Sequence, residues 1–266
     1  RLNYDYKDRY LAQISVRRDG SSTFGKNNRW GNFPGASAAW IISRENFMSN
    51  QNIIQNLKLR VGYGVNGNSE GFDPLQTVYR YKSIGSFYYD GKYIQALGSN
   101  VNVNSDLRWE KTAMFNAGLD FTVLSTKLSG TVDFYTKRTT DLIYDYPVST
   151  TLFSQDRFLA NVGEIYNKGI EVSLSATPLQ TENLRWEVSG VFAHNKNEVI
   201  KLSNYKYQLD SIAKAQASGA GTSGSYTQII DEGYPIGQFK VYEYRGMNEA
   251  GVSTFTATDG SITDNV

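Results

Sequence analysis

Apolar and polar residues alternate with a period of two through much of the chain. The clearest example lies at residues 57–65, where leucine, valine and tyrosine at odd positions alternate with lysine, arginine and glycine at even ones. Successive side chains of a β-strand point to opposite faces, so this pattern predicts a strand with one apolar and one polar face. Eight such stretches occur, at residues 2–6, 10–17, 33–43, 57–65, 115–123, 128–134, 170–177 and 186–192.

Several of these stretches are unusually long for strands. A strand in a globular protein usually has about five or six residues, whereas the stretches at 33–43, 57–65 and 115–123 have nine to eleven. A tilted strand needs about nine to eleven residues to cross a lipid bilayer. No apolar run approaches the roughly 18 residues of a membrane-spanning helix, but a transmembrane barrel needs none because only alternate side chains face lipid. The lengths therefore favour strands that cross a membrane.

The connections between the predicted strands alternate between short and long. Short ones are expected at residues 7–9, 44–56, 125–127 and 178–183, and long ones at 19–32, 66–106, 137–167 and from 195 onward. The first residues of 137–167 could still belong to the preceding strand. Up-and-down transmembrane barrels have tight turns on the inner side of the membrane and extended loops outside. Soluble sandwiches mix connection lengths with less order. We therefore predict an all-β fold, an antiparallel up-and-down transmembrane β-barrel with long extracellular loops.

Aromatic residues lie where a membrane interface would place them. Tyr6 and Tyr10 flank the first tight turn, and Trp40, Trp109 and Trp186 lie near predicted strand ends. Amphipathic rings favour the headgroup zone, which gives barrels their aromatic girdles. The competing explanation is that aromatic residues are simply common in strands. The girdle is the interpretation we favour.

The composition agrees with a β-rich chain and argues against several kinds of binding and catalytic site. The 266 residues include 19 Tyr, 13 Phe and 24 Gly but only 5 Pro, which suits long strands joined by polar loops. A net charge of +1 does not indicate the excess of positive charge that binding to nucleic acid requires. Because the chain has no cysteine, it has no disulfide scaffold, thiolate metal site or cysteine nucleophile.

Two candidate motifs have simpler structural explanations. Gly62, Gly64 and Gly67 fit the spacing of a dinucleotide-binding loop, but that loop must open a helix, and these glycines end a predicted strand. Small residues in a strand serve close packing or a bend. His194 is the single histidine, and we expect it at the base of a loop where a strand ends.

The carboxylate pairs are also better explained as solvated charges. Asp231 with Glu232, and Asp106 with Glu110, could in principle do acid–base work, but nothing ties either pair to one cleft. The turn at Asp259 is too short to supply the spaced oxygen donors of a calcium loop. We therefore expect no enzyme activity, no metal and no cofactor.

The long connection at residues 66–106 is rich in aromatic residues with few charges between them. Such residues suit stacking on sugar faces or packing against a protein partner. The alternative is that they pack the loop over the mouth of the barrel. The candidates for contact with substrate or partner are Trp30, Tyr79, Tyr81, Phe87, Tyr88, Tyr89 and Tyr93.

A series of short motifs runs from residue 2 to about residue 247. They lie at residues 4–10, 16–22, 24–25, 28–31, 33–34, 37–40, 57–60, 63–64, 67–68, 107–112, 133–135, 161–163, 167–171 and 233–237. Examples are Asp133-Phe134-Tyr135 at the end of one predicted strand and Gly233-Tyr234 in a late loop. By their order and spacing together, they resemble the SusC/RagA family of TonB-dependent outer-membrane transporters.

The resemblance implies a barrel of roughly 22 strands around an internal plug. This chain would supply about eight strands from the later half, so residues 1–266 are expected to be part of one barrel domain. The plug, the TonB-contacting segment, the early strands and the closing strand would lie outside it. The resemblance further implies import of a glycan oligosaccharide or peptide across the outer membrane of a member of the Bacteroidota. The implied partners are TonB, the lipid bilayer and a SusD-like surface lipoprotein.

Two rival interpretations stay open from the sequence alone. One is a different outer-membrane barrel, either a passive porin or an adhesin-like protein. The other is a soluble all-β enzyme or carbohydrate-binding protein, against which strand length and the order of the loops argue. The small-residue stretch at 212–226 predicts a mobile loop, with room for a short helix at 211–216.

Overall fold

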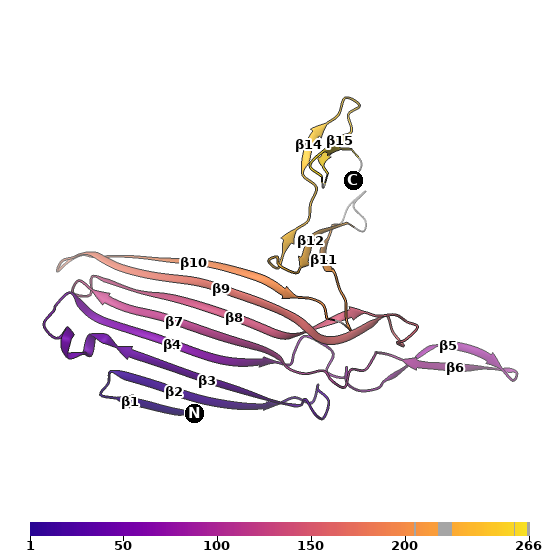
Figure 1. Cartoon of the computed structure of the whole chain (residues 1–266), viewed down its shortest axis with the longest axis horizontal. Helices are drawn as coiled ribbons and strands as arrows, with labels where there is room; N and C mark the ends of the chain where they lie inside the picture. Colours follow the sequence, from indigo (N-terminus) through magenta and orange to yellow (C-terminus); the bar gives the residue numbers. More distant parts are fainter. Residues whose placement is uncertain (205, 218–224, 258, 265–266) are drawn as a thin grey trace.

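A computed structural model describes residues 1–204, 206–217, 225–257 and 259–264 of the chain. Eight antiparallel strands of this part form one sheet in the order β1-β2-β3-β4-β7-β8-β9-β10 (Figure 1). Each overlaps one stretch predicted from the alternation, so all eight predictions are confirmed. The strands are β1 (Leu2–Tyr6), β2 (Tyr10–Gly20), β3 (Trp30–Ile41), β4 (Ile54–Asn68), β7 (Glu110–Val123), β8 (Leu128–Pro147), β9 (Arg157–Gln180) and β10 (Arg185–Lys201).

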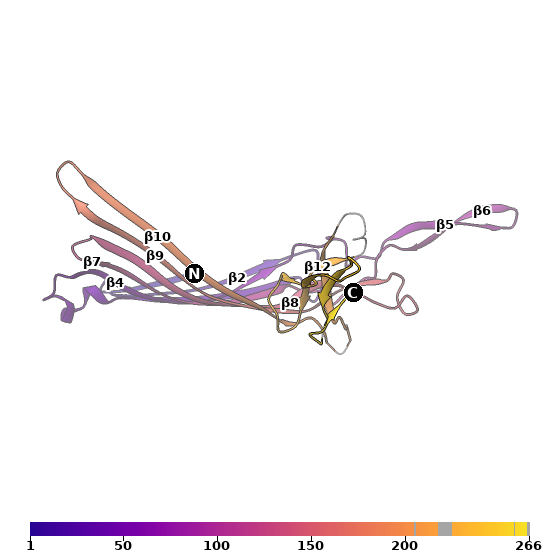
Figure 2. The ribbon, with the colours of Figure 1, turned by 90° about the horizontal axis from the view of Figure 1, so that it is seen from above.

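The sheet is curved and open, with β1 and β10 at its edges. Figure 2 shows β9 and β10 bending away from β4 toward the end that carries the short turns. Neighbours in the chain pair as neighbours in the sheet, so the predicted antiparallel up-and-down arrangement is confirmed. Within the described ranges, no helix is long and apolar enough to cross a membrane.

The short connections gather at one end of the sheet and the long ones at the other (Figure 1). The turn between β1 and β2 has positive φ at Lys7 (55°) and Asp8 (52°), as the tight turns of hairpins require. The link between β3 and β4 contains two single-turn 3-10 helices, η1 (Ile42–Arg44) and η2 (Asn46–Met48). We call the two ends of the sheet the short-turn end and the loop end.

The loop predicted at residues 137–167 is much shorter in the structure. β8 has 20 residues and β9 has 24, so only residues 148–156 connect them. The alternation fails there because the pairing shifts between Thr139 and Leu142, around Asp141 with a φ of 57°, and a bulge changes the face that each side chain occupies. Beyond it, Tyr146 and Phe158 are buried in protein.

Three small sheets extend from the loop end. The long connection after β4 forms the hairpin β5 (Tyr81–Tyr89) and β6 (Lys92–Ser99), which projects beyond the main sheet (Figure 1). Residues 211–216 are strand β11 (Ser211–Gln216), so the short helix considered there is wrong; pairing with β12 (Tyr226–Asp231) overrides the helix propensity of its alanines. The mobile loop predicted at 212–226 is wrong at residues 212–216 and at Tyr226, which lie in strands, and residues 218–224 lie outside the described residues. The remaining strands are β13 (Gln238–Phe239), β14 (Tyr244–Met247), β15 (Ser253–Thr256) and β16 (Ile262–Thr263).

The buried residues concentrate at the loop end. Phe24, Phe33, Leu107, Trp109 and Leu159 form one cluster that ties the connection after β2 and the segment before β7 to the sheet. Trp109 lies 5.3 Å from Phe24 and 5.4 Å from Phe33 between ring centroids. Two further clusters surround Tyr146 and Val199.

Candidate functional site

One face of the main sheet is apolar, and no part of the described chain forms a layer over it. Val16 is 68% exposed, Tyr63 52%, Phe134 44% and Phe192 60%. A soluble protein rarely leaves a contiguous apolar surface of this kind uncovered, because its exposure to water is unfavourable. The predicted strand faces are therefore present, and the apolar one is free to contact hydrocarbon.

The apolar band runs at a slant across the strands. Tyr10 on β2 and Phe192 on β10 share one row of paired residues, which passes through Trp40, Leu59, Leu119, Val132 and Val172. On β2 the apolar residues continue from this row toward the loop end, whereas on β10 they lie on its short-turn side. Strands tilted by about 35–45° to a membrane normal require such a slant, because rows of paired residues cross the membrane plane obliquely.

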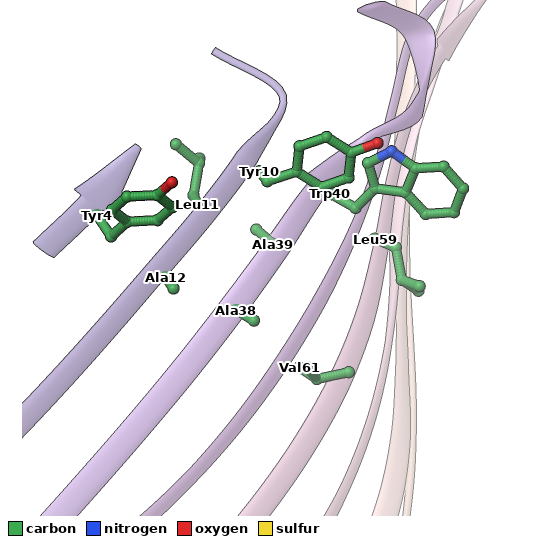
Figure 3. A pocket seen from close by; sticks show the side chains of 9 residues that line it. All are labelled: Tyr4, Tyr10, Leu11, Ala12, Ala38, Ala39, Trp40, Leu59 and Val61. Atoms are coloured by element: carbon green, nitrogen blue, oxygen red, sulfur yellow. The ribbon is translucent and has the colours of Figure 1, made fainter. Parts of the chain in front are cut away.

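A shallow groove crosses the apolar face near the short-turn end (Figure 3). It has a volume of about 310 Å³. The rings of Tyr10 and Trp40 are stacked at one side, 6.4 Å apart with an angle of 11°. Ala12 and Ala38 are among the small residues that line it, and Val61 also lines it. Its lining is suited to hydrocarbon.

Glu45, in the link between β3 and β4, holds the rings of Tyr10 and Trp40 in place through hydrogen bonds. Its carboxylate accepts hydrogen bonds from the Tyr10 hydroxyl at 2.6 Å, Trp40 Nε1 at 3.0 Å and Arg9 Nη1 at 3.1 Å. These donors hold the pKa of Glu45 below its ordinary value, the Tyr10 hydroxyl contributing most. An apolar ring with a polar tip held in this way suits the interface between lipid and water.

The opposite face of the sheet carries an ionic cluster at mid-strand. The Arg60 guanidinium on β4 donates to both carboxylate oxygens of Asp120 on β7, at 2.7–3.0 Å, and to Asp133 on β8 at 3.0 Å. Gly118 makes room for it, because a Cβ there would lie 2.3 Å from Asp133 Oδ1 and 2.6 Å from Arg60 Nη2. This face offers fixed charges to a water-filled interior.

The sequence did not reveal this cluster, although it held a usable signal. Arg60, Asp120 and Asp133 each stand at a polar position of an alternating stretch, so each could be assigned to the polar face. Their meeting depends on the register of three strands, which places Arg60 opposite Gly118 and Gly118 opposite Asp133.

At the loop end, the structure places five of the predicted aromatic candidates on one hairpin. Within it, Tyr88 and Tyr93 form an edge-to-face pair with ring centroids 5.2 Å apart, and Phe87 pairs with Ile94 across the strands on the other face. All five rings are at least half exposed, as on a surface able to stack on a ligand or pack against a partner. The five are Tyr81, Phe87, Tyr88 and Tyr89 of β5 and Tyr93 of β6.

The other two candidates lie apart from the hairpin. Tyr79 precedes β5 and is 72% exposed. Trp30 begins β3 on the same face as Trp40, where the Arg18 guanidinium lies 5.1 Å from its ring centre. That place matches an aromatic residue at the loop-side margin of the membrane.

The other candidate motifs lie in structural positions. The glycine motif is wholly inside β4, which fits the strand interpretation. His194 pairs with Ile170 in the middle of β10, so the expectation of a loop-base position is wrong; β10 continues to Lys201 because it pairs with the long β9. In the described part of the chain, no three His, Cys, Asp or Glu side chains are grouped to hold a metal ion.

The carboxylates considered for acid–base work hold backbone groups. Glu110 Oε1 accepts the Ile143 N–H at 2.8 Å, and Glu232 Oε1 accepts the Leu202 N–H at 2.6 Å. Both side chains therefore help to close connections at the loop end.

An open antiparallel sheet with tilted strands, one bare apolar face and one charged face defines the wall of a membrane-spanning β-barrel. The chain belongs to the TonB-dependent receptor family: the model for the TonB-dependent receptor-like β-barrel matches residues 1–265. Members of this family are outer-membrane proteins, which places the bare apolar face in contact with lipid.

Known relatives and solved structures agree with this assignment. The chain is 38% identical to TonB-dependent receptor P39 of Formosa agariphila over 98% of its own length, and 36% identical to TonB-dependent receptor SusC of Bacteroides thetaiotaomicron over 91%. It covers 23% and 24% of those proteins, about a quarter of each. The RagAB peptide importer superposes in its closed-closed and open-open states with TM-scores of 0.81 and 0.82 at 28% and 29% identity. Each match covers 99% of this chain, and 28% and 27% of the importer chain respectively.

Proposed function

We propose that this chain forms part of the wall of an outer-membrane importer for a large nutrient, either an oligosaccharide or a peptide. Uptake is driven by energy passed through TonB, and a SusD-like surface lipoprotein closes over the substrate. The plug, the TonB-contacting segment and the remaining strands belong to other parts of the same barrel protein. The chain itself performs no chemistry on the substrate.

The division of the sheet into a bare apolar face and a charged face carries this proposal. A strand in lipid satisfies its N–H and C=O groups only in a closed sheet, and a lumen wide enough for an oligomer needs many strands. Similarity along nearly the whole chain to SusC and to a peptide importer supports import over a passive pore.

The hairpin β5–β6 is our candidate for contact with substrate or lid. A lone two-stranded hairpin is marginally stable in water, and this one leaves apolar rings exposed on both faces. Tyr88 and Tyr93, beside the polar Ser86 and Gln95, offer a surface suited to sugar rings or peptide bonds. The opposite face, with Phe87 and Ile94, suits packing against a protein.

The boundaries of the hairpin define a clean deletion. Removing only residues 85–91 would delete half of β5 and leave β6 without a full partner strand. Replacing residues 82–98 with Asn-Gly removes the whole hairpin beyond Tyr81 and Ser99, which are cross-strand partners and can be joined by a two-residue turn. The hydrogen bonds at the base of the hairpin are then kept. The Asn100 N–H still donates to the Arg80 carbonyl at 2.9 Å, and Gln155 Nε2 still donates to the Ser99 carbonyl at 2.8 Å. We expect uptake of labelled substrate to fall about tenfold or more, because several aromatic contacts are lost together and each contributes about 0.5–1.5 kcal/mol beyond the area it buries.

A full-length hairpin with Phe87, Tyr88, Tyr89 and Tyr93 all changed to Ser should lose uptake to the same degree. The matched control is Tyr242→Ser, an exposed tyrosine outside the hairpin. Heat-modifiable gel migration verifies that each barrel has formed. Normal binding and transport without the hairpin would refute its role. Uptake that persists in cells lacking TonB would instead favour a passive porin.

A further inference from the structure

Two lysines face each other at the loop-side margin of the apolar face. Lys168 on β9 and Lys196 on β10 are direct cross-strand partners, and both are exposed. They share the face of Ile170 and His194, which form the next pair toward the short-turn end. The pair therefore stands where the apolar band of these two strands ends.

This arrangement is unfavourable for the isolated chain. Side chains directly opposite each other in an antiparallel pair have Cβ atoms about 4.5–5.5 Å apart, and like charges there repel. Within the described residues, neither ammonium group forms an ion pair. Two carboxylates lie on the same face toward the loops, but Glu164 pairs with Arg138 at 2.6 Å and Glu198 pairs with neither lysine.

We propose that Lys168 and Lys196 bind a phosphate group of lipopolysaccharide in the outer leaflet of the outer membrane. The long loops mark the outward side of the barrel, so the loop-side margin of the apolar band lies at the headgroups of that leaflet. An anion between the two ammonium groups converts their repulsion into attraction. Thr136 on the adjacent strand β8, directly opposite Lys168, offers a hydroxyl to the same headgroup.

Acyl chains of the same lipid have a surface to lie on. Phe134, Ile170 and Phe192 continue from the lysine pair toward the short-turn end, and each is exposed on the apolar face. A free phosphate ion would gain nothing from these apolar side chains, whereas a phosphorylated lipid contacts both them and the lysine pair. The surface thus combines a cationic pair with hydrocarbon contact.

The test uses the full-length receptor, delipidated in detergent and titrated with lipid A by native mass spectrometry. The double variant K168Q/K196Q should bind phosphorylated lipid A about fivefold more weakly for each lysine removed. The control K58Q/K137Q removes two lysines from the opposite face and should bind as the unmodified protein does. Heat-modifiable migration verifies that both barrels are folded.

Chemically dephosphorylated lipid A and inorganic phosphate are the remaining probes. We expect dephosphorylated lipid A to bind the unmodified receptor and K168Q/K196Q equally weakly, and inorganic phosphate not to displace phosphorylated lipid A at equal concentration. Three results would overturn the assignment: undiminished binding by the double variant, an equal loss in the control, or displacement by inorganic phosphate.

Discussion

The wall of the sheet and its loop end are stabilised in different ways. In the wall, side chains such as Val61 and Phe134 stay exposed on the apolar face, and Arg60 is paired on the charged face. At the loop end, Trp109 and Tyr146 are buried in aromatic clusters like those of a soluble domain. The wall depends on lipid to cover its apolar face, whereas the loop end provides its own core.

This difference explains where the sequence pattern is clear. A strand between lipid and water alternates strictly, because its two faces meet different solvents. At the loop end both faces meet protein, so apolar residues such as Phe158 and Leu159 follow one another without alternation.

Changing Trp109→Ala should disrupt the loop end and spare the wall. Removing a buried aromatic side chain costs about 3–5 kcal/mol, because the cavity between Phe24 and Phe33 cannot collapse fully. Limited proteolysis should then cut the connection at residues 21–29, while heat-modifiable migration stays normal. Loss of the folded barrel would show that the two regions are not separable.

Changing Val61→Arg should destabilise the wall and spare the loop end. A cation on the lipid face costs about 2–4 kcal/mol at the bilayer midplane. Urea unfolding in lipid vesicles measures the change. The control is Ser37→Arg, because Ser37 pairs with Gly62 on the charged face and its substituent would reach water. Equal destabilisation by both variants would contradict the assignment of the two faces.

Changing Arg60→Met should lower the free energy of unfolding by less than Val61→Arg does. Asp120 and Asp133 lose their shared cation, but the three side chains are 24–29% exposed, so water can solvate the two carboxylates and offset part of the lost stability. We expect roughly 1–2 kcal/mol in the same unfolding assay. Adding Asp133→Asn should restore part of it by removing one of two neighbouring negative charges. An Arg60→Met barrel as stable as the original would mean that the cluster adds no stability.

The smallest effect is expected at Glu45. Because its pKa is lower in the folded protein than in the unfolded chain, its stabilising contribution is present at neutral pH. That contribution is lost as the pH falls below the ordinary value of about 4.5 and through the depressed folded pKa. Hydrogen exchange at residues 42–48 should rise in that range, and Glu45→Gln should abolish the pH response. A response that persists in this variant would exclude Glu45 as its source.

The strands of the wall, their two faces and the order of short and long connections could be predicted from the sequence. These features follow from neighbours in the chain, because a period of two is a local property of the backbone. The residues that meet across strands, Arg60 with Asp133 and Lys168 with Lys196, became known only from the folded chain. The folded chain also shows that the long connections contain strands of their own. Register depends on contacts between distant segments, and a one-residue slip moves every side chain to the opposite face, so local pattern cannot fix it.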